Sequence, residues 1–136
     1  MVVAACREPD AQKRWQRMEK LIDIDKFLTF MAMELMTCHW DGYCNNRNNY
    51  RFYFGAVGGK LQFIPHGMDR ILGMHRGLLD LSLTVPRLGL VARALLNTPE
   101  GRRLYVDRVQ QLFDTMFKPD ALCRRANDIA ARTGID

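Results

Sequence analysis

Residues 39–69 read HWDGYCNNRNNYRFYFGAVGGKLQFIPHGMD, a polar segment followed by alternating apolar residues. It begins as a polar loop rich in Asn, a residue that tolerates left-handed backbone and hydrogen-bonds to its own main chain. YRFYF (50–54) and KLQFIP (60–65) then alternate in the manner of strands around the turn GAVGG (55–59). Two short strands around a Gly-rich turn predict a β-hairpin.

The segment after the hairpin changes character at Pro65, which has no N–H to donate to a strand ladder and therefore ends the second strand. HGMDRILGMHRG (66–77) follows, with three glycines that permit bends. We expect an irregular segment here. One structural role open to Asp69 is that of N-cap of a short helix starting at Arg70.

Helical periodicity precedes the polar loop. PDAQKRWQRMEKLI (9–22) repeats apolar residues at spacings of three and four, which predicts a helix. Asp25 is placed to cap a second helix over 26–39. The apolar stripe of this second helix is typical of a protein core rather than of a cofactor site. Its members are Ile24, Phe27, Leu28, Met31, Leu35 and Cys38.

Helices also follow the irregular segment. PRLGLVARALLN (86–97) is apolar and predicts a buried helix. Thr98-Pro99-Glu100 has the order of a helix start, with Thr as N-cap, Pro at the first position and an acid in the first turn. Lys118-Pro119-Asp120 breaks that helix, and Leu122, Ala126, Ile129 and Ala130 mark a final short one. The expected class is therefore α+β and mainly helical.

Bulk properties narrow the functional classes. The 136 residues suffice for one domain with a real core, and we see no internal boundary. The formal charge of +5 comes from scattered Lys and Arg, typical of solvated helix faces, so we expect no nucleic-acid partner. No apolar run approaches the roughly 18 residues of a membrane span, and no secretory signal is visible.

The four cysteines, Cys6, Cys38, Cys44 and Cys123, do not have the spacing of a zinc site with two CxxC-type pairs. Cys38 and Cys44 could meet His39 and His66 around a metal, but Cys38 fits better on a buried helix face. Cysteine usage does not fix the redox compartment.

A chemical pattern lies in the order helix, Asp41, hairpin, Asp69. Asn46 follows Asp41 by five residues, and both aspartates are expected at the same end of the hairpin. Protein kinases place H-R-D-x-x-x-x-N, two strands and a metal-binding Asp in this order. Phosphoryl transfer needs one carboxylate to orient a hydroxyl, and a carboxylate and an amide oxygen to hold Mg²⁺. Local sequence alone equally allows Asp41 and the asparagines to be loop residues.

At these residues the chain resembles the CotH kinase family of atypical protein kinases, named for spore coat protein H. The resemblance rests on LIDIDKFLTFMAMELMTCHWDGYCNNRNNYRFYF and GKLQFIPHGMDRILG, with PRLGLVARALLNTPEGRRLYVDRVQQLF similar to the helical region that follows. It covers most of residues 9–130. The implied fold is that of kinase C-lobe helices around a short β-hairpin, over a single partial domain 1–136.

The resemblance also implies site residues. Asp41 falls on the catalytic Asp, and Asp69 on the second, metal-binding Asp of the family's W-D-x-D motif. Asn46 matches the family's metal-binding Asn by the five-residue count and Asn49 matches it by position before the first strand, so both stay candidates. His66 and Gly67 replace the Trp and the first Asp of the motif, which puts two-metal binding in doubt.

The implied activity is transfer of the γ-phosphoryl group of ATP, with Mg²⁺, to Ser of a protein substrate. A kinase also needs a nucleotide-gripping N-lobe, which we do not find before Leu21, so we expect the isolated chain to be inactive and to depend on a missing N-lobe segment. The alternative is a non-catalytic binding or structural module of a surface or spore-coat-like protein. Family members are often secreted or on spore surfaces, but this sequence does not fix the compartment.

Overall fold

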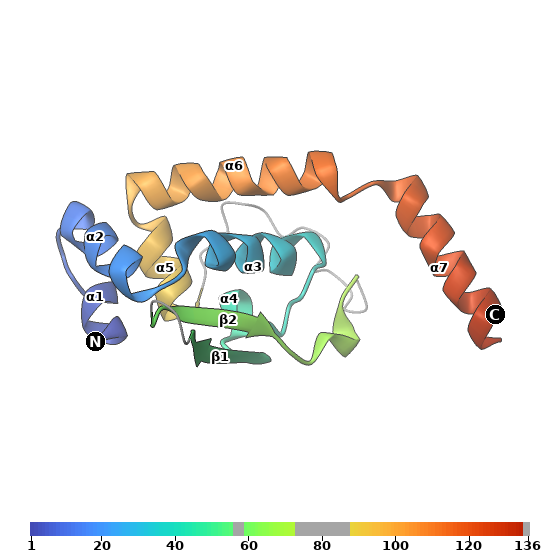
Figure 1. The fold of residues 1–136 in the computed structure, drawn as a ribbon, viewed down its shortest axis with the longest axis horizontal. Coiled ribbons are helices and arrows are strands. Elements are labelled where there is room, and N and C mark those ends of the chain that lie inside the picture. The colour runs from blue at the N-terminus through green and yellow to red at the C-terminus, as the bar shows by residue number, and fades with distance from the viewer. Residues whose placement is uncertain (56–58, 73–87, 135–136) are drawn as a thin grey trace.

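The part of the chain that this computed structural model describes, residues 1–55, 59–72 and 88–134, is mainly helical with a small antiparallel sheet (Figure 1). The predicted mainly helical α+β class is confirmed. The elements in chain order are α1 (Val2–Cys6), α2 (Ala11–Leu21), α3 (Ile24–Met36), α4 (Tyr43–Asn46), β1 (Tyr50–Phe54), β2 (Leu61–Pro65), the 3₁₀ helix η1 (Met68–Arg70), α5 (Leu90–Leu96), α6 (Pro99–Thr115) and α7 (Pro119–Thr133).

Helix α3 is the centre of the structure. It packs against α6 on one side and β2 on the other, while α1, α2 and α5 close one end (Figure 1). Its buried face carries Phe27, Leu28 and Met31, as the apolar stripe predicted. The core extends from these residues to other elements, at Met18, Ile22, Tyr43, Leu61, Val91, Leu95, Tyr105 and Leu112.

The predicted hairpin is confirmed. β1 and β2 pair antiparallel, with Tyr50 opposite Pro65 at one end and Phe54 opposite Leu61 at the other. Main-chain hydrogen bonding ties β2 to the start of α3, because Leu61 O accepts from Asp23 N at 3.0 Å. The hairpin is therefore fixed to the core through β2. Residues 56–58 of the turn lie outside the described part of the chain, as do residues 73–77 of the predicted irregular segment.

The start of α3 corrects one prediction. Asp23, not Asp25, is its N-cap, and the Asp23 side chain accepts from Lys26 N at 3.3 Å. Asp25 lies in the first turn and forms an ion pair with Arg108 of α6. The observed N-cap differs from the predicted one because the helix starts at Ile24, two residues before the predicted start, and Asp25 is therefore already within the helix.

The end of α3 corrects a second prediction. The helix ends at Met36, and Cys38 is not on its buried face but beyond it, in the left-handed region at φ 53°. His39 N donates to Glu34 O at 2.8 Å and Cys38 N donates to Leu35 O at 3.0 Å. This pair of hydrogen bonds defines a Schellman motif, which stops a helix and turns the chain. Cysteine occupies the position that glycine usually takes.

The C-terminal helices follow the sequence signals with shifted bounds. Thr98 caps α6 as predicted, and its side chain accepts from Gly101 N at 3.0 Å. The predicted helix over 86–97 begins at Leu90, and residues 86 and 87 lie outside the described part. Pro119 ends the break and begins α7, which is longer than predicted and has no buried residue. It extends away from the other elements (Figure 1).

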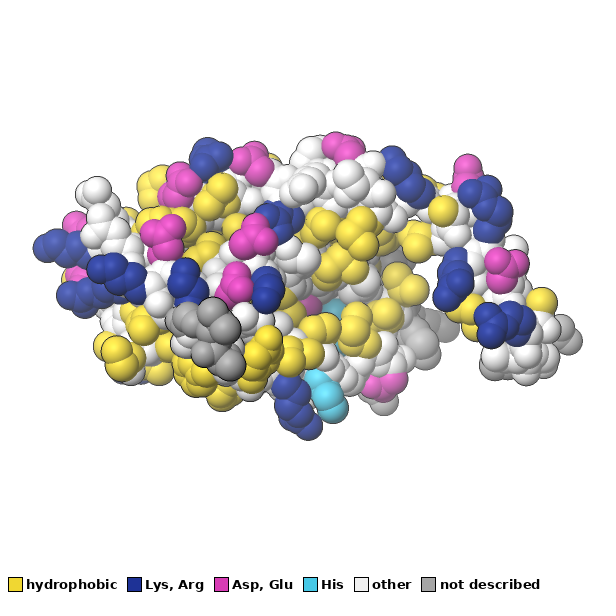
Figure 2. All heavy atoms as spheres, viewed as in Figure 1, with side chains coloured by type: hydrophobic (Ala, Val, Ile, Leu, Met, Phe, Trp, Pro, Cys, Tyr) yellow, Lys and Arg dark blue, Asp and Glu magenta, His cyan; other side chains and the backbone are white. Residues whose placement is uncertain are grey.

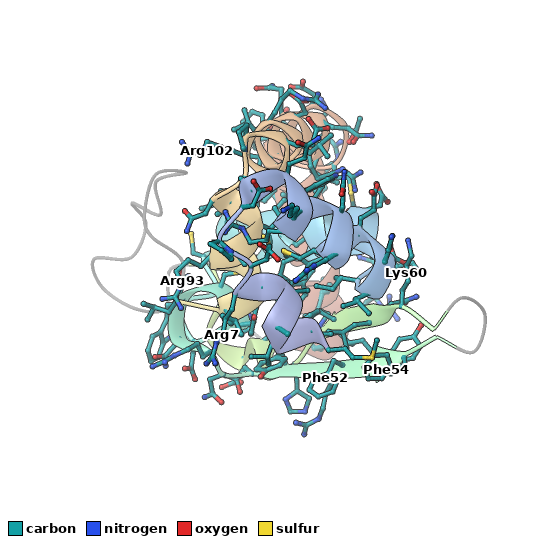
Figure 3. The ribbon with its side chains drawn as sticks, turned by 90° about the vertical axis from the view of Figure 1, so that its left-hand side faces the viewer. Arg7, Phe52, Phe54, Lys60, Arg93 and Arg102 are labelled. Atoms are coloured by element: carbon teal, nitrogen blue, oxygen red, sulfur yellow. The ribbon has the colours of Figure 1, made fainter. Side chains whose placement is uncertain are left out.

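The surface combines scattered charge with exposed apolar side chains. On the face in Figure 2, Lys and Arg side chains lie at both ends and also across the middle, with acidic side chains among them. Phe52 and Phe54 on β1 are 57% and 60% exposed, on the part of the molecule away from α6 (Figure 3). No helix within the described residues is long and apolar enough to span a bilayer.

Candidate functional site

Asp41 lies in the turn between the Schellman motif of α3 and the short helix α4. Gly42 N donates to His39 O at 3.2 Å, and α4 begins directly afterwards at Tyr43. This helix of four residues stands where the sequence predicted only a polar loop. Asp41 therefore lies in a turn held by main-chain hydrogen bonds and not in an irregular loop.

Three asparagine side chains surround the Asp41 carboxylate. The amide of Asn46 donates to Oδ1 at 2.5 Å, and those of Asn48 and Asn49 donate to Oδ2 at 3.2 and 2.8 Å. Asn46 and Asn49, the two candidates from the sequence, are thus brought together with Asp41. Asn48, which its sequence context marked only as a loop residue, is a third donor to this carboxylate. Its only sequence signal was the same Asn-rich composition.

These hydrogen bonds favour the ionised carboxylate. The pKa of Asp41 is lowered from its ordinary value, first by the hydrogen bond from Asn46 and further by those from Asn48 and Asn49. Asp41 is therefore an anion at neutral pH. Each of the three asparagines directs its N–H group to Asp41, and the amide oxygen of Asn49 lies against Gly67.

The backbone around the asparagines adopts uncommon conformations. Arg47 and Asn49 have φ values of 60° and 48°, in the left-handed region. Asn adopts this region more readily than most residues, whereas Arg does so rarely. Such conformations persist where the surrounding structure enforces them, and they cluster at functional sites. Here they direct Asn46, Asn48 and Asn49 toward one carboxylate.

Asn49 also joins the Asp41 turn to the segment that carries Asp69. Its main-chain oxygen accepts from His66 N at 3.1 Å, which continues the ladder beyond Tyr50 and Pro65. A Cβ built on Gly67 would lie 2.6 Å from Asn49 Oδ1, so the Asn49 side chain packs directly on Gly67. Asp69 follows two residues later, exposed, within η1. Asn49, which donates to Asp41, thus contacts the segment before Asp69 at one end of the hairpin.

Behind the turn lie two buried ionisable side chains, His39 and Glu34, which are 1% and 3% exposed. Neither ring nitrogen of His39 has a hydrogen-bond partner within the described part of the chain. The carboxylate of Glu34 accepts from Tyr43 N and from Cys44 N, both at 2.8 Å. Burial raises the pKa of Glu34, and the hydrogen bonds from Cys44 and Tyr43 oppose this shift.

Metal ligation by Cys and His finds no support in the described residues. Among them, no group of three or more His, Cys, Asp or Glu side chains is arranged to hold a metal ion. His66 is exposed beyond β2, whereas Cys44 is buried in α4. An alternative donor set combines one or two carboxylates with amide oxygens, which suits Mg²⁺ when substrate phosphates complete the coordination. Asp69, Asn46 and Asn49 offer these groups.

Two surface hollows among the described residues lie on other elements than the Asp41 turn. One is bounded by α2, α3 and α6, with Trp15, Leu28 and Arg108 among its lining residues, and another lies over α6 beside Pro99, Arg102 and Asp107. Neither of these hollows is lined by Asp41, Asn46, Asn49 or Asp69.

Comparison with known proteins adds independent information. Residues 2–134 match the family model described as CotH kinase protein. The chain is 29% identical to spore coat protein homolog 1 of Rhizopus delemar, in an alignment covering 70% of this chain and 18% of that protein. It is 34% and 33% identical to invasin CotH2 and invasin CotH3 of the same organism, in each case over 42% of this chain and 10% of the relative.

Proposed function

Because this chain belongs to the CotH kinase family, whose model it matches over residues 2–134, we propose that it carries part of the phosphoryl-transfer site of an atypical protein kinase. The proposed reaction moves the γ-phosphoryl group of ATP, with Mg²⁺, to a Ser hydroxyl of a protein substrate. The chain spans 18% of the length of spore coat protein homolog 1, so we propose that residues 1–136 correspond to a C-lobe-like part of the catalytic unit.

The proposal rests chiefly on the environment of Asp41. An ionised carboxylate in a fixed turn can accept a hydrogen bond from a Ser hydroxyl and orient its oxygen toward a phosphorus atom. Asn46, Asn48 and Asn49 restrict the position of this carboxylate through their hydrogen bonds. Asp41 would then take the hydroxyl proton as the new oxygen–phosphorus bond forms.

Asn49 is the better supported of the two amide candidates for the magnesium site. Asn46 contacts Asp41 from α4, whereas Asn49 contacts Asp41 and packs on Gly67 beside the Asp69 segment. A ligand shared by the two acidic segments must lie between them. We therefore assign Mg²⁺ to Asp69 and Asn49, with Asn46 as the second amide. When bound, the ion would neutralise charge on the ATP phosphates.

Gly67 limits this site to fewer acidic ligands than the family motif offers. It has φ 59° and lies against the Asn49 side chain. With no carboxylate at position 67, a single Mg²⁺ fits the donor set better than two.

The test uses Mn²⁺ as a paramagnetic substitute for Mg²⁺, because both ions prefer oxygen ligands. Mn²⁺ binding to the chain is measured by electron paramagnetic resonance, with and without ATP. We expect Asp69→Asn to weaken binding by about tenfold or more, the equivalent of ~1.4 kcal/mol. Asp120→Asn, an exposed acid at the start of α7, is the matched control and should leave binding unchanged. Equal affinities for all three proteins would exclude Asp69 as a ligand.

Catalysis is tested by transfer of labelled phosphate from ATP to a serine-rich protein, in the longest natural protein that contains this chain. Asp41→Asn should abolish transfer while leaving Mn²⁺ binding largely intact, because Asn keeps the size but cannot accept the proton. Transfer that survives Asp41→Asn at the original rate would contradict its role as base.

A second candidate function is a non-catalytic binding module of a surface or spore-coat-like protein. It is favoured by the exposed aromatic residues Phe52 and Phe54 on β1 and by Gly67 at an acidic position of the motif. Two relatives of this chain are named invasins. The Mn²⁺ titration separates the two functions, since a purely structural module needs no ATP-dependent ion binding at Asp69.

A further inference from the structure

Glu34 is a buried carboxylate in the last turns of α3, and the proposed reaction gives it no part. Its side chain is directed to the turn that carries Asp41. Oε1 accepts from Tyr43 N and Oε2 accepts from Cys44 N, each at 2.8 Å. These are the first two residues of α4, so both carboxylate oxygens are used by the main chain that follows Asp41.

The main chain of the same residue holds the other side of the turn. Glu34 O accepts from His39 N at 2.8 Å, as part of the Schellman motif that ends α3. Residues 39 and 43–44, on either side of Asp41, are thus hydrogen-bonded to one residue. The turn can move relative to α3 only if at least one of these three hydrogen bonds breaks.

The turn also packs directly against the Glu34 carboxylate. A Cβ built on Gly42 would overlap the Glu34 side chain, with Oε1 as the nearest atom. Gly42 is buried and lies between Asp41 and α4. The main chain at Gly42 therefore packs directly against the Glu34 carboxylate, and this contact restricts the conformations that the turn can adopt.

We propose that Glu34 is a positioning residue that fixes the orientation of Asp41 for phosphoryl transfer, an inference that rests on the proposed function. The same turn carries the Asp41 carboxylate, which accepts hydrogen bonds from Asn46, Asn48 and Asn49. A carboxylate suits this task because both of its oxygens accept, so that it satisfies two parallel N–H groups with charge-assisted hydrogen bonds. A Gln amide of the same size accepts with one atom and presents N–H to the other donor.

The test is nuclear magnetic resonance of the chain with Glu34→Gln. The readout is hydrogen exchange of the side-chain amides of Asn46, Asn48 and Asn49, which report whether Asp41 still faces them. We expect exchange to accelerate by about tenfold or more in Glu34→Gln, because loss of a hydrogen bond to a charged group allows the turn to open.

Leu112→Ala is the matched control. Leu112 is a buried residue of α6, and its truncation destabilises the core without touching the turn. Under conditions where both variants remain folded, its asparagine amides should exchange as in the unaltered chain. Unchanged exchange in Glu34→Gln, or equal acceleration in both variants, overturns the proposal.

A second variant keeps the inference testable if Glu34→Gln does not fold. Gly42→Ala retains the Glu34 charge but pushes the turn away from the carboxylate, so the same asparagine signals should change. If the amides respond as expected and the longest natural protein that contains this chain binds no Mn²⁺ with ATP, Glu34 positions the turn but the proposed kinase role fails. If Mn²⁺ binds and the amides do not respond, the positioning role alone fails.

Discussion

Asn49 and Gly67 touch so closely that a Cβ on Gly67 would lie 2.6 Å from Asn49 Oδ1. The contact joins the end of the Asn-rich loop to the segment before Asp69. It is reinforced by the hydrogen bond of 3.1 Å from His66 N to Asn49 O. The residue at position 67 must therefore be small as long as Asn49 keeps its hydrogen bond to Asp41.

The first prediction concerns Gly67→Ala. Alanine at φ 59° costs about 1–2 kcal/mol of stability for the backbone alone, and contact with Asn49 adds to this cost. Gly59→Ala is the control, since Gly59 has φ 59° and no atom within 4 Å of an added Cβ. Urea denaturation should show the larger loss for Gly67→Ala. Equal losses would mean that the Asn49 contact carries no energetic weight.

The second prediction concerns the pH dependence that Glu34 introduces. Burial raises the pKa of Glu34 above its ordinary value of 4.5. Between 4.5 and the raised pKa the folded chain binds a proton that the unfolded chain does not, so the contribution of Glu34 to the free energy of unfolding falls as pH rises through this window. Below 4.5 both states are protonated, and the contribution of Glu34 is then fully present.

Glu34→Gln isolates this contribution, because it removes the titration and keeps the size. The free energy of unfolding, measured in urea at pH values from about 4 to 8, should fall with rising pH more steeply for the unaltered chain than for the variant. Asp41 acts in the opposite direction and in another range. Its lowered pKa gives stability that is lost only as pH falls below 3.8. Parallel curves for the two proteins would show that Glu34 keeps an ordinary pKa.

The sequence predicted those parts of the fold that depend on local signals. The hairpin followed from alternation around a Gly-rich turn, and Thr98-Pro99 marked the start of α6. The end of α3 was mispredicted because its Schellman motif has Cys38, not glycine, in the left-handed position. α4 was not predicted because its first two N–H groups donate to Glu34, nine and ten residues earlier, and its own N-cap residue supplies no side-chain hydrogen bond that the sequence could reveal.

The candidate site was predictable to a similar degree. Asp41, Asn46 and Asn49 stood out by spacing and resemblance, and the structure brings these three together. Glu34 was not among the predicted site residues. Its position offered a signal, because it follows Phe27 and Met31 at helical spacing and so lies on the apolar face. A charge on the buried face of a helix needs a partner, and here the partners are backbone amides that no helical pattern reveals.

The third prediction concerns Thr98, the cap of α6. It is 1% exposed, accepts from Gly101 N at 3.0 Å and donates to Leu95 O at 2.7 Å. Thr98→Ala removes both hydrogen bonds and should lower the free energy of unfolding by about 1–2 kcal/mol. Thr98→Ser keeps the hydroxyl and should cost less than half as much. Chemical denaturation measures both, and a Ser variant as unstable as the Ala variant would shift the cause from the hydroxyl to the methyl group.

The fourth prediction concerns Tyr43, which joins the Asp41 turn to α5. Its hydroxyl oxygen accepts from Val91 N at 2.8 Å, and burial raises its pKa above the ordinary value of 10.0. The ring packs against Phe63 and Tyr50, with centroids 4.8 and 4.7 Å away. Tyr43→Phe keeps this packing but leaves the Val91 N–H without its acceptor, which should cost about 1–3 kcal/mol.

Tyr53→Phe provides the comparison for Tyr43→Phe. The Tyr53 hydroxyl donates to Gln62 at 2.8 Å on the exposed face of the hairpin, where water can replace the lost partner. Its loss should change the free energy of unfolding by less than about 0.5 kcal/mol. Urea denaturation with hydrogen exchange at Val91 N distinguishes the two sites. If Val91 N stays as protected in Tyr43→Phe as in the unaltered chain, α5 is held by packing rather than by the Tyr43 hydroxyl.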